Sequence, residues 1–237
     1  MPYVGVTEIV STTGTTASGT VTATAGNALI ASVAASWNGT PPHGAGVVAR
    51  SGDTWTTHLY QVYQPTSFED GIFLASAPNC AGGTVTCTFS CSTANSGLQG
   101  WVLEYSGLPS SAIVDTAASG TAGTSTTPSS ASLTNTQATA LFVAGIANYD
   151  GNNPATLTST GTGWTRPGAE LNGSLYYPNA IAYKEVSSIA AQQQTYTTAN
   201  NQWVMVIGSF KVGGGAAQDT PELRHARENQ MQQLLAQ

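Results

Sequence analysis

Short apolar runs alternate with clusters of Gly, Pro, Asn and Ser along the chain as far as residue 212. Runs of strand length that are separated by turn residues in this way are typical of an all-β sandwich or barrel. The first part of the chain therefore predicts strands at 3–10, 19–24, 28–36, 46–50, 54–62, 71–76, 84–90 and 98–105. The second part predicts strands at 140–147, 155–159, 173–177, 180–186, 193–198 and 202–212.

One apolar run occurs twice with a similar ending. The first copy ends in Trp37-Asn-Gly and the second in Tyr149-Asp-Gly, and Leu29 then aligns with Leu141. Because a repeat within the sequence indicates a repeated structural unit, we expect two related halves.

Shorter matches follow the first one in the same order. They pair Trp55 with Trp164 and Trp101 with Trp203. The sequence thus predicts a jelly-roll-like antiparallel β-sandwich built from two pseudo-repeated halves, about 19–107 and 130–212.

The halves could fold as two separate sandwiches, or interleave as the two Greek keys of one jelly roll. No linker rich in Pro or charge divides them, so one β-sandwich over residues 1–212 is the favoured interpretation. The stretch 118–132, rich in Ser, Thr, Ala and Gly, could be a long surface loop.

The end of the chain differs in composition. Residues 213–219 are predicted to form a flexible linker, and residues 220–237 a helical arm with its helix at about 221–236. Thr220 is suited to the N-cap position and Pro221 to the first helical position.

This predicted helix has a broad apolar stripe, and a helix of its length is marginal alone in water. The stripe is the candidate partner-binding site, and its residues are Leu223, Ala226, Met231, Leu234 and Leu235. We expect it to contact another subunit; the alternatives are docking on its own sandwich and a frayed tail.

Charged residues make up 8% of the chain, against about 25% in typical globular proteins. Abundant Thr, Ser, Ala, Gly and Asn indicate strands with neutral, hydroxylated faces. Such a surface is poorly protected against association by charge repulsion, so we expect neighbouring subunits to cover it, as a homo-oligomer or within a larger assembly.

The net charge of −6 argues against nucleic acid as a partner, because phosphate binding needs clustered Lys and Arg. No apolar run is long enough to span a membrane, and no secretory signal peptide is visible. We therefore expect the protein to be assembled in the cytoplasm in which it is made; the alternative location is extracellular.

Few side chains are suited to catalysis, so neither an enzyme nor a cofactor is predicted. His58 is expected to be a packed or surface histidine, and Glu104 a solvent-facing strand residue. A carboxylate pair from among Glu104, Asp115, Glu69 and Asp70 could serve a hydrolase, as a minor alternative. The cysteines Cys80, Cys87 and Cys91 allow three readings: free thiols, a Cys80–Cys87 disulfide, or a metal site.

Several aromatic residues could form a platform for sugars, namely Trp37, Trp55, Trp101, Trp164 and Trp203 with Tyr149, Tyr176 and Tyr177. The pairing of Trp55 with Trp164, and of Trp101 with Trp203, instead favours equivalent core positions. Binding of glycans therefore stays the alternative to a structural role.

Several strand motifs resemble those of uncharacterised β-sandwich proteins of bacteria and their phages. They are Asn27-Ala-Leu-Ile, Asp53-Thr-Trp-Thr, Gly83-Thr-Val-Thr and Trp101-Val-Leu-Glu-Tyr-Ser-Gly-Leu. The resemblance covers roughly residues 20–212 and implies a jelly-roll-like fold with a structural role on a virion, such as capsid decoration or a head or tail surface protein. It supplies no catalytic residues. The chain departs from secreted members in its missing signal peptide and its predicted helical arm, and both departures fit a virion component. The expected function is thus that of a non-enzymatic structural protein, with a carbohydrate-binding or adhesion module as the alternative.

Overall fold

The computed structural model describes residues 3–11, 14–38, 46–63, 68–95, 97–149, 157–159, 161–167, 179–198 and 201–213. These residues form antiparallel β-sheets, and no helix occurs among them. The all-β, sandwich-like class predicted from the apolar runs is therefore confirmed. The predicted helix at 221–236, its five partner-binding residues and the predicted strand at 173–177 lie outside the described residues.

Most strands are bounded by Gly, Pro or Asn, as the turn residues of the sequence suggest. Their bounds are β1 Tyr3–Ser11, β2 Gly14–Ala23, β3 Ala28–Asn38, β4 Val47–Arg50, β5 Thr56–Tyr63, β6 Phe68–Ala77, β7 Gly83–Asn95, β8 Gly97–Tyr105, β9 Val114–Ser125, β10 Leu133–Thr134, β11 Ala140–Tyr149, β12 Thr158–Ser159, β13 Asn179–Val186, β14 Ala191–Gln192, β15 Tyr196–Thr197 and β16 Asn201–Lys211.

Three larger sheets and two short pairs result from the pairing of these strands. Sheet A has the order β1-β8-β3-β6-β5, sheet B the order β2-β7-β4, and sheet C the order β13-β11-β16-β9. The short pairs β10-β14 and β12-β15 are called the outer pairs below.

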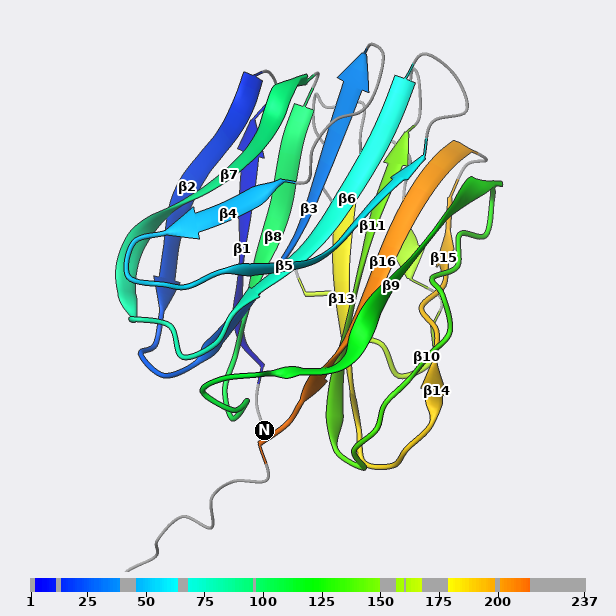
Figure 1. The fold of residues 1–237 in the computed structure, drawn as a ribbon. Helices are drawn as coiled ribbons and strands as arrows, with labels where there is room; N and C mark the ends of the chain where they lie inside the picture. The colour runs from blue at the N-terminus through cyan, green and yellow to red at the C-terminus, as the bar shows by residue number, and fades with distance from the viewer. Residues whose placement is uncertain are drawn as a thin grey trace, which may run out of the picture.

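The sheets lie in layers, with sheet B, sheet A, sheet C and the outer pairs following one another across the molecule (Figure 1). One buried cluster, including Leu29, Phe89 and Val102, fills the space between sheets A and B. A second, including Ile30 and Val206, fills the space between sheets A and C. The alternation of side chains along a strand explains this, because successive residues of a central strand face opposite layers.

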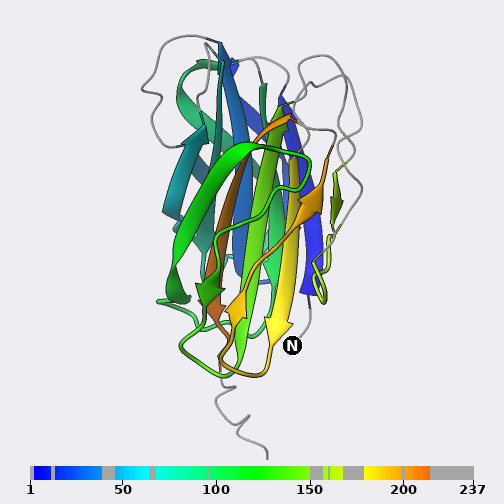
Figure 2. The same ribbon diagram turned by 90° about the vertical axis from the view of Figure 1, so that its right-hand side faces the viewer.

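The outer pairs cover the remaining face of sheet C, and they lie in front of it when that side faces the viewer (Figure 2). Leu157 and Tyr196 pack there against Trp203 and Met205 of β16. Leu133 packs against Phe142 of β11 nearby. The two central strands of sheet C, β11 and β16, are therefore buried on both faces.

Sheets A and C approach each other closely where sheet C carries glycine. A Cβ at Gly145 of β11 would overlap Ser32 Oγ and come within 2.9 Å of Ser32 Cβ. A Cβ at Gly208 of β16 would come within 2.6 Å of Leu74 Cδ2. Since real Cβ atoms do not approach so closely, a Cβ at either position would force the facing side chain or the sheet itself to shift.

Strand β9 is the main element that the sequence did not predict. It spans Val114–Ser125, although residues 118–132 had suggested a surface loop. Gly120 faces the side chain of Gln61 on β5. A Cβ at Gly120 would lie only 2.8 Å from Gln61 Cβ, which is too close for two carbon atoms. Small residues suit this crowded place, and they leave the strand without an apolar pattern.

The two copies of the apolar run differ in their surroundings. Leu29 belongs to the cluster between sheets A and B, whereas Leu141 belongs to the cluster between sheets A and C. A shift of one residue moves every side chain of a strand to the other face. The alignment of Leu29 with Leu141 therefore does not pair equivalent core positions.

We expect Gly145→Ala to destabilise the fold by about 1–3 kcal/mol, because it overpacks the contact between sheets A and C. Urea unfolding followed by tryptophan fluorescence measures this free energy. Adding Ser32→Gly should restore most of the loss. Gly5→Ala is the control, since no atom lies within 4 Å of a Cβ at Gly5; an equal loss in both single variants would contradict the close-approach argument.

Candidate functional site

The turn that follows β4 brings polar groups to one edge of sheet B. Asp53 N–H donates a hydrogen bond to Arg50 O over 3.1 Å. Gly52 has a φ of 86°, a conformation that glycine adopts without steric cost. The sequence Arg50-Ser-Gly-Asp53 therefore folds back on itself and places both charged side chains on the same side.

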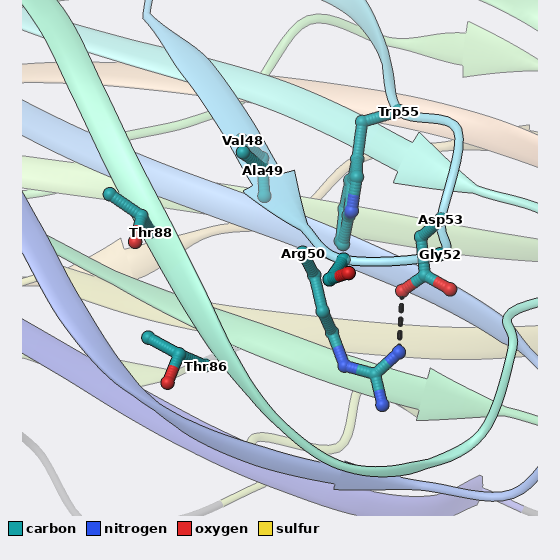
Figure 3. A pocket seen from close by; sticks show the side chains of 9 residues that line it. Val48, Ala49, Arg50, Gly52, Asp53, Trp55, Thr86 and Thr88 are labelled. Carbon is teal, nitrogen blue, oxygen red and sulfur yellow. Dashed lines mark hydrogen bonds and ion pairs between the residues drawn. The ribbon is translucent and has the colours of Figure 1, made fainter.

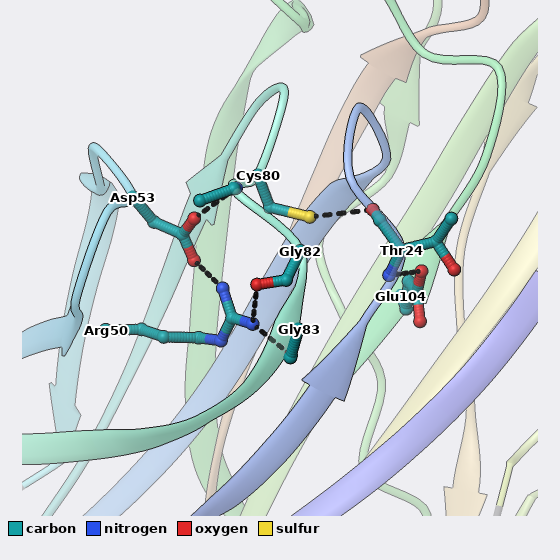
Figure 4. A network of polar contacts seen from close by, with 8 residues as sticks. Thr24, Arg50, Asp53, Cys80, Gly82, Gly83 and Glu104 are labelled. Atoms are coloured by element: carbon teal, nitrogen blue, oxygen red, sulfur yellow. Dashed lines mark hydrogen bonds and ion pairs between the residues drawn. The ribbon is translucent and has the colours of Figure 1, made fainter.

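Arg50 joins this turn to the segment that precedes β7 (Figure 4). Its Nη1 donates to Asp53 Oδ2 over 2.6 Å, and its Nη2 donates to Gly83 O over 2.7 Å and to Gly82 O over 3.2 Å. Asp53 Oδ1 in turn accepts a hydrogen bond of 2.8 Å from Ala81 N–H. The side chains of both charged residues are fully buried, so the pair neutralises itself within the protein.

Glu104 secures a neighbouring turn. Its Oε1 accepts hydrogen bonds from Thr24 N–H over 2.8 Å and from Asn27 Nδ2 over 2.6 Å. The expectation of a solvent-facing carboxylate is wrong, because Glu104 is 7% exposed. It lies on β8, a strand with a neighbour on each side and a sheet against each face, so that all its residues are buried.

A groove of about 540 Å³ lies along the β4 edge, next to the Arg50–Asp53 pair (Figure 3). Its lining includes Trp55, which directly precedes β5, and the outward-facing residues Thr86 and Thr88 of β7. The Trp55 indole is half-buried and packs against the cluster between sheets A and B. The groove thus combines an aromatic side chain with hydroxyl groups, above an ion pair whose side chains are buried.

Two N–H groups on residues that line the groove lack an acceptor in the protein, namely Arg50 Nε and Trp55 Nε1. A buried donor without an acceptor is costly, and such groups are uncommon in folded proteins. Because of its aromatic and hydroxyl lining, the groove is the strongest candidate for a binding site among the described residues.

The other Trp residues with described side chains have structural surroundings. Trp101 and Trp203 are 5% and 8% exposed, and their indole N–H groups donate to Asn179 O and Ser125 Oγ over 3.2 and 3.1 Å. Trp164 donates to Gln193 O over 3.1 Å. The preference for core packing is confirmed for Trp101 and Trp203. They nevertheless face different layers, since Trp101 contacts the core between sheets A and C and Trp203 the core under the outer pairs.

His58 lies at a second hollow, of about 350 Å³, where β5 and β6 meet the start of β9. His58 Nε2 lies 2.6 Å from Ser76 Oγ, and its ring meets Phe210 edge-on. Burial lowers the pKa of His58. Ser76 is only 1% exposed, so a substrate in solution does not reach this hydroxyl. The two side chains therefore form a hydrogen bond that belongs to the fold.

Two of the four acidic candidates for hydrolysis, Glu104 and Asp115, have described side chains, and these two do not form a pair. Glu104 is bound at the β2–β3 turn, while Asp115 on β9 accepts hydrogen bonds from Thr136 N–H and from Ser209 Oγ. The side chains of Glu69 and Asp70 lie outside the described part.

All three cysteines are free thiols. Burial raises the pKa of the Cys87 thiol to about 12, and Cys80 donates its S–H to Thr24 O. Within the described ranges, no group of three or more His, Cys, Asp or Glu residues could hold a metal ion. Of the three readings, the structure therefore contains the reduced, largely buried thiols.

The sequence does not predict Arg50 or Asp53 as site residues, although Asp53 opens the Asp53-Thr-Trp-Thr motif. A signal was present, because the chain has only six Lys and Arg residues and this one stands three residues before an Asp. An isolated charge at the end of an apolar strand, followed by a Gly-containing turn, favours a buried ion pair.

Comparison with protein-family models, with curated proteins and with solved structures finds no match to this chain. In the part of the chain that the structure describes, no helix has the length and apolar character needed to cross a membrane.

We expect Arg50→Met to destabilise the protein by about 3–5 kcal/mol, because it leaves Asp53 and two carbonyl groups without their buried partner. The measurement is the free energy of unfolding in urea. In a double-mutant cycle with Asp53→Asn, the double variant should lose less than the sum of the two single variants. Strict additivity would show that the two side chains do not act as a unit.

Proposed function

We propose that the chain is a non-enzymatic structural protein of a phage-type particle, as a capsid decoration or a head or tail surface component, and that it acts through contacts between subunits. The observation that carries this proposal is the free edge of β1. Among the described residues, β1 pairs only with β8, and its other edge has no partner strand. An unpaired edge offers N–H and C=O groups to a strand of another chain.

Proteins that stay monomeric usually protect such edges with Lys, Pro or short strands. Strand β1 has nine residues, and its only charged residue is Glu8. Val4 and Val10 are 44% and 37% exposed on it. The bulge between Tyr3 and Gly5 and the single charge of Glu8 are weak protection for a strand of this length. The edge is therefore better suited to pairing than to exposure in solution.

The proposal includes a duplicated jelly roll, and the strand order supports it. Sheet A contains β1-β8-β3-β6, and sheet C contains β9-β16-β11-β13 when its order is reversed. In this correspondence β13 takes the place of β6. Thr165 forms an isolated bridge with Tyr183 of β13 and so takes the place of β5, which pairs with β6. The outer pairs correspond to sheet B if β14 and β15 together take the place of β7. In a jelly roll of eight strands, the first strand lies beside the eighth and the second beside the seventh, as β1, β8, β2 and β7 do.

The predicted arm at 220–237 is a second contact in this proposal, through Leu223, Ala226, Met231, Leu234 and Leu235. The particle is assembled in the cytoplasm of the host, and the partners are copies of this chain or other structural subunits. No net basic surface is required for these contacts, which fits a chain with a net charge of −6.

We expect the double variant Val4→Lys/Val10→Lys to lose self-association or attachment, because two charges on the edge oppose strand pairing. Multi-angle light scattering of the purified protein measures the mass of the assembly. Both side chains are exposed, so the melting temperature should change little. Ile189→Lys is the control, since Ile189 is 60% exposed and lies between β13 and β14. If the double variant forms an assembly of the same mass as the original protein, the β1 edge is not part of the interface.

Truncation after Gly213 tests the arm separately. Gly213 N–H still donates to Gly107 O over 3.0 Å in the shortened chain, so we expect an unchanged melting temperature. Incorporation into the particle, or oligomerisation, should be lost. A truncated chain that assembles as the full chain does would contradict the role of the arm and leave the β1 edge untouched.

A further inference from the structure

The outward face of sheet B carries hydroxyl groups at nearly every position of its two longer strands. Residues 16, 18, 20 and 22 of β2 and residues 84, 86, 88 and 90 of β7 are all Thr or Ser, and they point away from the core. The alternate residues, such as Val21 and Phe89, belong to the buried cluster beneath. Across all three strands of sheet B the only charged residue is Arg50, whose side chain is buried.

Cross-strand contacts fix part of this hydroxyl face. Ser18 Oγ lies 2.8 Å from Thr88 Oγ1, and Thr22 Oγ1 lies 2.9 Å from Thr84 Oγ1. Thr20 stands opposite Thr86 between these pairs, and neither side chain is hydrogen-bonded to another described residue. Neighbouring hydroxyls are spaced by roughly 6.6 Å along a strand and 4.8 Å between strands. The face thus offers a fixed array of groups that both donate and accept hydrogen bonds.

The β4 groove opens onto the edge of this array, and Thr86 and Thr88 belong to both. Trp55 adds an aromatic surface to the groove, and the buried Arg50–Asp53 pair beneath it leaves no net charge there. The donors Arg50 Nε and Trp55 Nε1 are buried behind the same wall, where solvent does not reach them. Aromatic and hydroxyl groups therefore meet at one place.

The chemistry of this place selects among possible ligands. A nucleic acid or an acidic chain would need a free cation, but the two Nη atoms of Arg50 are bound to Asp53 and to two carbonyl groups. A lipid or an apolar peptide would leave the hydroxyl rows without partners. A neutral, polyhydroxylated chain satisfies both conditions, because its hydroxyls exchange hydrogen bonds with Thr and Ser and its C–H faces pack against an indole.

The geometry points to a neutral carbohydrate chain as the ligand of the β4 groove and of the adjoining hydroxyl face of sheet B. The sugar ring in the groove contacts Trp55 and exchanges hydrogen bonds with Thr86 and Thr88. This assignment does not depend on a role in a particle, because the groove lies on the β4 edge and the proposed subunit contacts use β1 and the arm.

Titration of the full-length protein tests the assignment, with maltohexaose, cellohexaose, xylohexaose and chitohexaose as neutral probes and heparin as an acidic one. Tryptophan fluorescence and calorimetry report binding. We expect at least one neutral hexaose to saturate with a Kd below about 1 mM, and heparin not to bind.

The variant Thr86→Val/Thr88→Val keeps the shape of both side chains and removes two hydroxyls, so it should weaken binding about tenfold. Trp55→Phe keeps an aromatic ring but reduces its area in the groove, so it should also weaken binding. The matched control is Thr158→Val/Thr197→Val, which alters two exposed, paired Thr residues of the outer pair β12-β15 and should bind as the original protein does.

Three results would overturn the assignment: no binding of any neutral hexaose at about 10 mM, binding of heparin alone, or equal affinity in the Thr86/Thr88 variant and its control. Melting curves of each variant exclude unfolding as the reason for lost binding. A monomeric protein that binds a hexaose would leave this inference intact and remove the assembly proposal, and an assembling protein that binds none would do the reverse.

Discussion

The side chains of Ser32 and Leu74 reach the backbone of sheet C because Gly145 and Gly208 carry no Cβ there. This contact sets the distance between the two inner sheets, and the buried cluster between them can close only at that distance. Dispersion contacts fall off steeply with separation, so a gap of even 1 Å would forfeit a substantial part of their energy. The polar turns at the edges, with Arg50 and Glu104, then hold sheets whose spacing is already fixed.

The apolar strands could be predicted from the sequence because burial on both faces leaves a strong signal. Strands β3, β6, β8, β11 and β16 have long runs of buried residues, and their predicted bounds agree with the structure to within a few residues. Strand β9 could not be found in this way. Its place against β5 requires small residues such as Gly120, and small residues resemble those of a loop.

The candidate site was harder to predict, since its parts come from distant places in the chain. The sequence offers Trp55 as an aromatic candidate for a binding site. Only the fold shows that Trp55 lines the same groove as Thr86 and Thr88 of β7. The error about Glu104 has a related cause. Alternation along one strand cannot reveal that a second sheet covers the face on which a carboxylate lies, and in β8 both faces are covered.

The stacking of four layers also makes the molecule a spacer of fixed length. Packed sheets lie about 10 Å apart, so the hydroxyl face of sheet B stands about 30 Å from the outer pairs. A molecule attached to a surface through its outer pairs would direct its hydroxyl face into the surrounding solution. Many copies attached in this way would present many hydroxyl faces in a common orientation. Weak single contacts then add up through avidity. When a ligand with repeated units dissociates from one copy, its contacts with neighbouring copies keep it close, at a high effective concentration.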